Sequence, residues 1–344
     1  MEDSFLDIAT NLSISTMNVE TIFDRFNQVN VLIVGDVMID RYLNGKIERI
    51  SPEAPVPVVN LQASENRLGG AANVALNVKA LGATPYLCSV VGDDKYGQLF
   101  QEILTEASIS TKYISVSSQR RTTVKTRIIA SNQHVLRVDE EDTKNLSEDE
   151  QEDYLSIIKE LLDQKEIQVI LFQDYNKGVL NTRTIREIIL EGIKRDIPTV
   201  VDPKFKNFWE YKRVNLFKPN LREIAAKVPF EVKADLESLK KATQYIKQQI
   251  GNHHTMITLS SQGIFVDEKG GKISPTKQRA IADVCGAGDA VISAAALGLA
   301  CGMELSKIVQ LANLAGGQVC ERVGVSPVDL KQLKKEYKVL ISGV

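Results

Sequence analysis

The residues best suited to chemistry form one octapeptide, Ala282-Asp283-Val284-Cys285-Gly286-Ala287-Gly288-Asp289, which precedes a small apolar run at 290–301. That run predicts a buried helix, and the backbone N–H groups of Gly286, Ala287 and Gly288 at its start are free to bind an anion. Asp289 falls in the first turn, where the helix dipole favours its ionised form. An anion cradle beside a carboxylate suits transfer of a phosphoryl group to a hydroxyl, with Asp289 as the base. The alternative is that Asp289 only caps the helix and the glycines only turn the chain.

Cys285 stands immediately before these glycines, where a helix N-terminus could lower the pKa of its thiol. The alternative is that it only fills a small buried space. Cys88, Cys301 and Cys320 lack the spacing of metal ligands, and the three histidines form no ligand set either. We therefore expect reduced thiols and no metal site built from Cys or His.

The composition excludes several other classes of protein. Of the 344 residues, 43% are hydrophobic and 25% are charged, and the formal net charge is −2, so no basic footprint for nucleic acid is present. No apolar run approaches the length of a membrane span, and the acidic N-terminus lacks the features of a signal peptide. We expect a cytoplasmic protein that binds neither nucleic acid nor membrane.

The elements that must position the octapeptide alternate between short apolar runs and amphipathic segments, a pattern typical of an α/β fold with a parallel sheet. The predicted strands are 31–34, 86–91, 169–172, 198–201, 216–218 and 256–259. The predicted helices are 73–81, 96–107, 148–164, 182–195, 236–249 and 290–301. Two segments, 41–63 and 112–138, predict β-strands outside the main sheet, with prolines suited to edge positions. Residues 1–25 predict a weakly anchored extension, within which a helix at 19–26 stays open.

The octapeptide resembles the second signature of the PfkB-type (ribokinase-like) carbohydrate kinases, Asp-Thr-x-Gly-Ala-Gly-Asp, with Val284 in place of the Thr. Upstream, Gly69-Gly70-Ala71-Ala72-Asn73-Val74-Ala75 resembles the family's first signature. The resemblance implies a ribokinase-like, doubly wound, mainly parallel sheet flanked by helices. It also implies a small β lid over the sugar site, which would exclude water and often forms a dimer contact. ATP and Mg²⁺ would be required, and a need for a monovalent cation stays open.

Further stretches resemble, within this family, the kinase domain of the D-glycero-β-D-manno-heptose-7-phosphate kinases. They are Gly35–Tyr42 (GDVMIDRY), Ser51–Val59 (SPEAPVPVV), Asn132–Asp139 (NQHVLRVD), Asp174–Gly178 (DYNKG) and Val201–Lys204 (VDPK). We therefore expect a kinase domain at 26–344 with lid strands at about 41–63 and 112–138. No His-x-Gly-His motif is present, so we expect no adenylyltransferase domain here, and the downstream adenylyltransferase on a separate chain.

Asp36 and Asp40 follow the first predicted strand, at the carboxyl end of the sheet where ligands usually bind. Their carboxylates suit acceptance of hydrogen bonds from sugar hydroxyls, and the alternative is a loop cap. Gly69 and Gly70 allow close backbone approach to the sugar, and Asn73 can donate and accept. The alternative for Asn73 is helix capping.

Several cations could hold a phosphate on the substrate or on ATP. Lys125, Arg127, Gln133 and Arg137 are predicted on the lid, where they could bind the 7-phosphate, and Arg137 is favoured. Lys177 follows a strand end and is assigned to the substrate, and Lys204 follows another and is assigned to ATP.

Asn220 and Glu223 resemble the family's Asn-x-x-Glu motif, which organises Mg²⁺ through water. The alternative is a capping box at a helix start. Lys218, two residues earlier, departs from the small polar residue common there. For the nucleotide, Ser260 and Gly263 lie in a predicted loop after a strand, and Asn313 lies on the helix after the catalytic one.

These observations predict a homodimeric kinase that phosphorylates the anomeric hydroxyl of heptose 7-phosphate for lipopolysaccharide assembly. One rival is another PfkB-type kinase acting on a hexose, ketose or nucleoside. A second is a non-catalytic sugar or nucleotide sensor, against which Asp289 and Glu223 argue. A nicotinamide-binding protein is disfavoured, because no Gly-x-Gly-x-x-Gly follows the first strand.

Overall fold

The main sheet of the protein, in a computed structural model that describes residues 19–131 and 133–342, runs in the order β13-β12-β11-β10-β9-β8-β1-β4-β5. Its strands from β5 to β11 are parallel, and β12 and β13 add an antiparallel edge. The strands are β1 (Asn30–Gly35), β4 (Thr84–Gly92), β5 (Ile114–Ser117), β8 (Val169–Gln173), β9 (Thr199–Asp202), β10 (Leu216–Phe217), β11 (His254–Thr258), β12 (Ile264–Val266) and β13 (Lys272–Ser274). This confirms the predicted doubly wound α/β fold.

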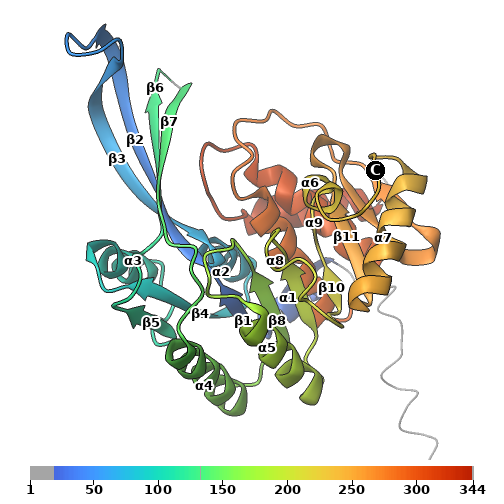
Figure 1. Ribbon diagram of the computed structural model, residues 1–344. Coiled ribbons are helices and arrows are strands. Elements are labelled where there is room, and N and C mark those ends of the chain that lie inside the picture. The colour runs from blue at the N-terminus through green and yellow to red at the C-terminus, as the bar shows by residue number, and fades with distance from the viewer. Residues whose placement is uncertain (1–18, 132, 343–344) are drawn as a thin grey trace, which may run out of the picture.

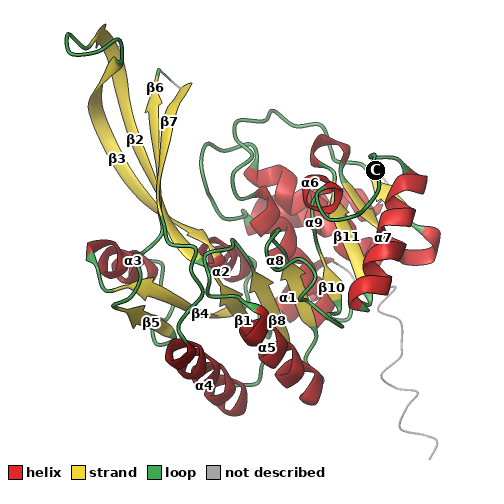
Figure 2. Ribbon diagram, in the orientation of Figure 1, coloured by secondary structure: helices red, strands yellow, loops and turns green. Residues whose placement is uncertain are grey.

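Helices cover both faces of this sheet, because its strands bury alternate side chains on opposite sides. In β1, Val31 and Ile33 join one core with α1, α2, α3, α8, α9 and α10, whereas Leu32 and Val34 join the other with α4, α5, α6 and α7 (Figure 2). The helices are α1 (Val19–Phe26), α2 (Ala71–Ala80), α3 (Lys95–Glu106), α4 (Glu148–Gln164), α5 (Thr182–Lys194), α6 (Leu221–Ala225), α7 (Leu236–Ile250), α8 (Ala287–Ala300), α9 (Leu305–Val319) and α10 (Leu330–Ser342). Two short 3₁₀ helices, η2 (Ser260–Gln262) and η3 (Glu268–Gly270), follow β11 and β12.

A second sheet, which we call the β-arm, projects beyond the body of the molecule (Figure 1). It has the strand order β3-β2-β6-β7 and consists of β2 (Val37–Ile50), β3 (Pro57–Gly70), β6 (Val124–Ala130) and β7 (Gln133–Glu140). Pro57 begins the edge strand β3, which agrees with the expectation for proline. β2 directly follows β1, and β3 leads directly into α2, so the base of the β-arm lies at the carboxyl end of the main sheet.

One prediction for the second sheet was wrong. The segment 112–138 was expected to lie wholly outside the main sheet, but β5 pairs in parallel with β4 as the last strand of that sheet. Ile114 is buried there, because an edge strand beside β4 still covers apolar surface of the core. The β-arm therefore takes only the later part of this segment.

The N-terminal helix left open by the sequence forms as α1. Its residues Phe23 and Phe26 are fully buried, and the ring of Phe23 meets that of Tyr337 on α10 at 6.5 Å in an edge-on geometry. Residues 19–25 are thus anchored to the body, while residues 1–18 of the predicted extension lie outside the described residues. Within the described part of the chain, no helix is long and apolar enough to cross a membrane.

Candidate active site

The Gly-Ala-Gly-Asp segment lies where α8 begins, beside α2 and the carboxyl ends of β8 and β9. Gly286 caps α8 with a φ of +81°, a left-handed conformation that favours glycine. A Cβ at this position would also lie only 3.0 Å from the side-chain nitrogen Nδ2 of Asn73. The helix that follows is apolar on all sides and buried, so it holds the first turn in a fixed place.

Asp289, in that first turn, is only 4% exposed and accepts three hydrogen bonds from side chains. Asn73 Nδ2 donates to Oδ2 at 2.6 Å, while Gln173 Nε2 and Tyr175 Oη both donate to Oδ1 at 3.0 Å. The donors come from α2, the end of β8 and the loop after β8. We call these four residues the transfer-site network.

Burial raises the pKa of Asp289 to about 7, with nearby Asp202 adding to the rise. The hydrogen bonds from Asn73 and Tyr175, together with the charge of Lys218, oppose the rise because they favour the carboxylate. A carboxyl group with a pKa near neutrality is well matched to the task of a general base.

Gln173 and Tyr175 were missed as site residues in the sequence. The available signal was their place at and just after the end of a buried strand, at the edge where ligands bind in open α/β sheets. For Asn73, the helix-capping alternative was wrong, because α2 is capped by Gly70 without a side-chain bond and the Asn73 side chain turns to Asp289.

The backbone N–H groups predicted to form the anion cradle differ in their partners. The N–H of Ala287 donates to the carbonyl of Val284 at 3.3 Å, a long hydrogen bond. Gly288 belongs to the first turn of α8, whose N–H groups have no intrahelical acceptors. The cradle therefore stays a prediction that centres on this turn.

Asp36 and Asp40 are both buried, but they face different partners. The Asp36 carboxylate accepts N–H groups of Tyr175, Lys177 and Val179 at 2.9–3.1 Å, so it ties down the loop after β8. Burial raises its pKa despite these bonds. The Asp40 carboxylate instead forms a buried ion pair with Arg127. A side chain at Gly69 would overlap that carboxylate, which explains the glycine there.

Three of the predicted phosphate-binding cations meet two carboxylates where the β-arm joins the body. Lys125 lies 3.1 Å from Asp139 and 3.0 Å from Glu141, Lys177 lies 2.7 Å from Glu141, and Arg137 lies 2.8 Å from Asp139. We call these five residues the arm-base cluster. The Arg137 side chain is 59% exposed, whereas those of Lys125 and Lys177 are 14% and 13% exposed.

The structure does not bring Gln133 to this group. Gln133 pairs with Ala130 at the tip of the β6–β7 hairpin, and Ala130 in turn pairs with Gly45 of β2. Gly45 lies five positions along β2 from Asp40, which corresponds to roughly 17 Å of strand. The predicted role of Gln133 in substrate binding is therefore corrected. Its neighbour Asn132, quoted in the same motif, lies outside the described residues.

Asn220 and Glu223 form the capping box that was one of their two predicted roles. Glu223 N–H donates to Asn220 Oδ1 at 2.9 Å, and Asn220 N–H donates to Glu223 Oε2 at 2.8 Å. The other oxygen of Glu223 accepts a hydrogen bond from Lys204 Nζ at 2.5 Å. Burial and the charge of Asp202 raise the pKa of Glu223.

These residues fit Mg²⁺ only in an indirect way. Among the described residues, no group of three or more His, Cys, Asp or Glu could hold a metal ion. Asn220 and Glu223 alone suit a cation whose other ligands are phosphate oxygens and water, which is how Mg²⁺ usually binds with nucleotides. Glu223 would then face the water shell.

The predicted nucleotide residues lie together at the β11–β13 edge of the sheet. Ser260 and Gly263 bound a tight turn, and a Cβ at Gly263 would overlap the carbonyl of Ser274. Asn313 donates to the carbonyls of Ser274 and Pro275 at 3.2 and 2.8 Å. Asn313 therefore fixes the strand end against which this turn packs.

The lowered thiol pKa considered for Cys285 was wrong. Burial raises its pKa to about 11, and the hydrogen bond and charge of Asp283 add to the effect. The thiol is therefore protonated at neutral pH and is a poor nucleophile.

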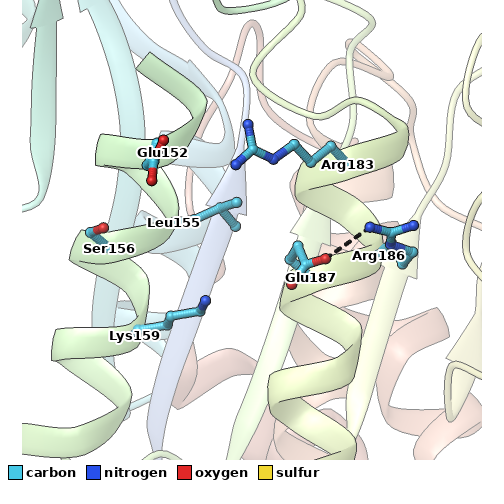
Figure 3. A pocket seen from close by; sticks show the side chains of 7 residues that line it. All are labelled: Glu152, Leu155, Ser156, Lys159, Arg183, Arg186 and Glu187. Carbon is cyan, nitrogen blue, oxygen red and sulfur yellow. Dashed lines mark hydrogen bonds and ion pairs between the residues drawn. The ribbon is translucent and has the colours of Figure 1, made fainter. Parts of the chain in front are cut away.

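A cleft between α4 and α5 lies apart from these groups (Figure 3). Its lining residues are mostly charged and of both signs: Glu152, Leu155, Ser156, Lys159, Arg183, Arg186 and Glu187. Arg186 is paired with Glu187 at 3.0 Å. None of the seven belongs to the transfer-site network or the arm-base cluster, so we do not place substrate there.

Comparison with known proteins identifies the family of the chain. The pfkB family carbohydrate kinase model matches residues 28–332. Bifunctional protein HldE of Pelobacter propionicus is 39% identical over 316 residues, which cover 90% of this chain and 64% of that protein. Bifunctional protein HldE of Aliarcobacter butzleri is 38% identical over 304 residues, 88% of this chain and 63% of that protein. The chain thus spans less than two thirds of the length of these relatives.

Solved structures show the same fold at low sequence identity. Phosphofructokinase-2 from Escherichia coli in complex with potassium has a TM-score of 0.75 and 19% identity, covering 91% of this chain and 99% of that one. Ribokinase from Arabidopsis thaliana, complexed with ribose and ATP, has a TM-score of 0.68 and 16% identity, covering 89% and 98%.

Proposed function

The chain belongs to the pfkB family of carbohydrate kinases, and from that premise we propose that it transfers the γ-phosphoryl group of ATP to the anomeric hydroxyl of D-glycero-D-manno-heptose 7-phosphate. The product would be the 1,7-bisphosphate, and an adenylyltransferase activity would act further downstream in ADP-heptose and lipopolysaccharide synthesis. The observation that carries the phosphoryl transfer is Asp289, buried at the start of α8 among three hydrogen-bond donors.

In the proposed transfer, Asp289 acts as the base. The hydroxyl oxygen of the sugar forms a bond to the γ-phosphorus, its proton passes to Asp289, and ADP leaves with the electrons of the broken P–O bond. Amide N–H groups at the start of α8 would stabilise charge on the transferring group. Mg²⁺ would neutralise phosphate charge when bound, and Glu223 and Asn220 are the residues that would hold its water shell. A potassium complex is described for one structural neighbour, which supports testing a monovalent cation.

Two observations support a phosphorylated sugar. The arm-base cluster gathers three cations around two carboxylates, so one positive charge is left for an anionic ligand. The cluster lies at the base of the β-arm, where its member Lys125 on β6 pairs with Asp40 on β2. Relatives of more than 35% identity are named bifunctional protein HldE, which agrees with the heptose-phosphate resemblance seen in the sequence.

The decisive experiment is an ATP-consumption assay across phosphorylated and free heptoses and hexoses, with Mg²⁺ present. We expect heptose 7-phosphate to be consumed with the highest kcat/KM. A preference for a free hexose, a ketose or a nucleoside would replace the proposed substrate while leaving the kinase assignment intact.

We also propose a homodimer formed through the β-arm. Several of its large apolar side chains are exposed: Ile47, Ile50, Val56, Leu61, Val135, Leu136 and Val138. An exposed apolar sheet of this kind favours pairing with a second copy. Light scattering should give twice the chain mass, and Leu61→Lys together with Leu136→Lys should give the monomer. A monomeric parent protein would reject the proposal.

A further inference from the structure

A buried ion pair lies beside the N-terminus of α8, and neither of its residues contacts substrate in the proposed function. Lys218 Nζ lies 3.1 Å from Asp202 Oδ2, and the two side chains are only 3% and 8% exposed. Lys218 follows β10 and Asp202 ends β9, so the pair stands at the carboxyl ends of two neighbouring parallel strands.

The pair faces the first turn of α8. A Cβ built on Gly288 would lie 3.8 Å from Lys218 Nζ and 3.7 Å from Asp202 Oδ2. The absence of a side chain at Gly288 therefore leaves the ammonium group open to the same space as the N–H groups of this turn. An anion bound at the helix start would meet the Lys218 charge directly.

The same pair is connected to the base. Gln173 Nε2 donates to Asp289 Oδ1 at 3.0 Å and lies 3.4 Å from Asp202 Oδ2. Lys218 and Asp202 also act on the Asp289 pKa in opposite directions, Asp202 raising it and Lys218 lowering it. The cation and the base thus belong to one buried polar chain.

Stability alone is a weak reason for this arrangement, because burying two charges costs desolvation that their attraction often fails to offset. An ammonium has three hydrogen-bond donors, and in the described part of the chain Asp202 is the one acidic group within ion-pair distance of it. The remaining donors suit oxygens of a ligand.

We propose that Lys218 is a catalytic residue whose ammonium contacts the phosphoryl group in transit, and that Asp202 positions it. This inference rests on the phosphoryl transfer of the proposed function and not on the identity of the sugar. As the sugar oxygen bonds to phosphorus and the bond to the ADP oxygen breaks, charge spreads over the phosphoryl oxygens. Lys218 would stabilise that charge, while the proton goes to Asp289.

The test compares Lys218→Met, Asp202→Asn and the double variant with the control Lys206→Met, whose lysine is exposed and bonds Asn145. We expect Lys218→Met to lower kcat by about 10²-fold, the usual cost of losing one transition-state donor, with little change in the KM for the sugar. Lys206→Met should match the parent. The double variant removes both charges of the ion pair, so it leaves no unpaired buried charge that could destabilise the fold. Its kcat should stay as low as that of Lys218→Met.

Two outcomes would overturn the proposal. Recovery of kcat in the double variant would show that Lys218 only neutralises Asp202. Recovery of Lys218→Met at pH 9, well above the Asp289 pKa of about 7 in the parent, would show that Lys218 only lowers the pKa of the base. If the parent consumes ATP with some other sugar, the heptose proposal fails, but the same variants still test Lys218 with that sugar.

Discussion

The transfer-site network and the arm-base cluster both contain carboxylates that accept hydrogen bonds, yet the pKa values of these carboxylates are shifted in opposite directions. Burial raises the pKa of Asp289 to about 7. For Asp139 and Glu141, partial burial acts in the same direction, but hydrogen bonds from Lys125, Arg137 and Lys177 outweigh it and lower both pKa values. Asp289 is buried among neutral hydrogen-bond donors, whereas the side chains of Asp139 and Glu141 are 25% and 23% exposed and are directly paired with cations.

This contrast separates a group that must change protonation from groups that only hold charge. A carboxyl with a pKa near 7 can accept a proton during turnover, while paired carboxylates stay ionised and keep their cations in place. The Arg137 side chain is accessible to solvent, so its ion pair with Asp139 contributes little to stability. We infer that the value of the arm-base cluster lies in binding an anion.

The largest effect is expected from Asp289→Asn. The amide cannot accept the proton, so kcat should fall by about 10²–10⁴-fold, the usual contribution of a general base. Affinity for ATP should change little, which nucleotide titration can check on the folded variant. Turnover equal to that of the parent, at matched ATP and Mg²⁺, would remove Asp289 from the mechanism and with it the contrast between the two regions.

A smaller effect, specific to one substrate, is expected in the arm-base cluster. A charge-assisted contact to phosphate is worth about 1.5–3 kcal/mol, or roughly one to two decades in kcat/KM. Lys177→Met should therefore lower kcat/KM for heptose 7-phosphate by this amount and hardly affect the free heptose. Arg137→Ala should follow the same pattern with a smaller loss, because its side chain is more exposed.

Equal losses on the phosphorylated and the free sugar would mean that these cations support the β-arm and do not bind phosphate. In that case the phosphate site would have to be sought at Lys204.

Tyr175→Phe should change the pH dependence of activity, because Tyr175 contacts the base Asp289. Activity of the parent should rise with pH through about 7, because Asp289 must be ionised to accept the proton. The Tyr175 hydroxyl donates to the carboxylate and lowers its pKa, so its loss should move this acid limb to higher pH. At pH 7 we expect a loss of about tenfold, the lower end for a hydrogen bond to a charged group. An unmoved limb would show that the hydroxyl does not act on the base; Lys177→Met serves as the control, since it should not move the limb.

The smallest effect is expected from Cys285→Ser. Because burial raises the pKa of the thiol to about 11, the residue should serve only to fill space, and most activity should remain. Steady-state assays before and after treatment of the parent with a thiol reagent give a second measurement. An inactive but folded serine variant would show that the thiol takes part in the reaction.

Much of the fold follows from local pattern. The six predicted strands of the main sheet lie within or overlap β1, β4, β8, β9, β10 and β11, because strands buried on both faces read as continuous apolar runs. The strands β12 and β13 were not predicted, because runs of three residues carry little periodicity, and β5 was predicted as a strand but in the wrong sheet. Helix α8 was predicted from its small apolar residues and its glycines.

The sequence by itself determined the chemistry of the α8 start, because the glycines, the helix and Asp289 are contiguous and the N–H groups of a first turn are local features. Only the tertiary structure decided which residues surround Asp289. Asn73 and Asp289 are 216 positions apart, and Gln173 and Asp289 are 116 apart, so their contact depends on the order of the parallel strands. It likewise separated Gln133 from the site and joined Lys218 to Asp202. Burial is a property of the assembled fold, and together with the charge of Asp202 it raises the Asp289 pKa to about 7, as a base at neutral pH requires.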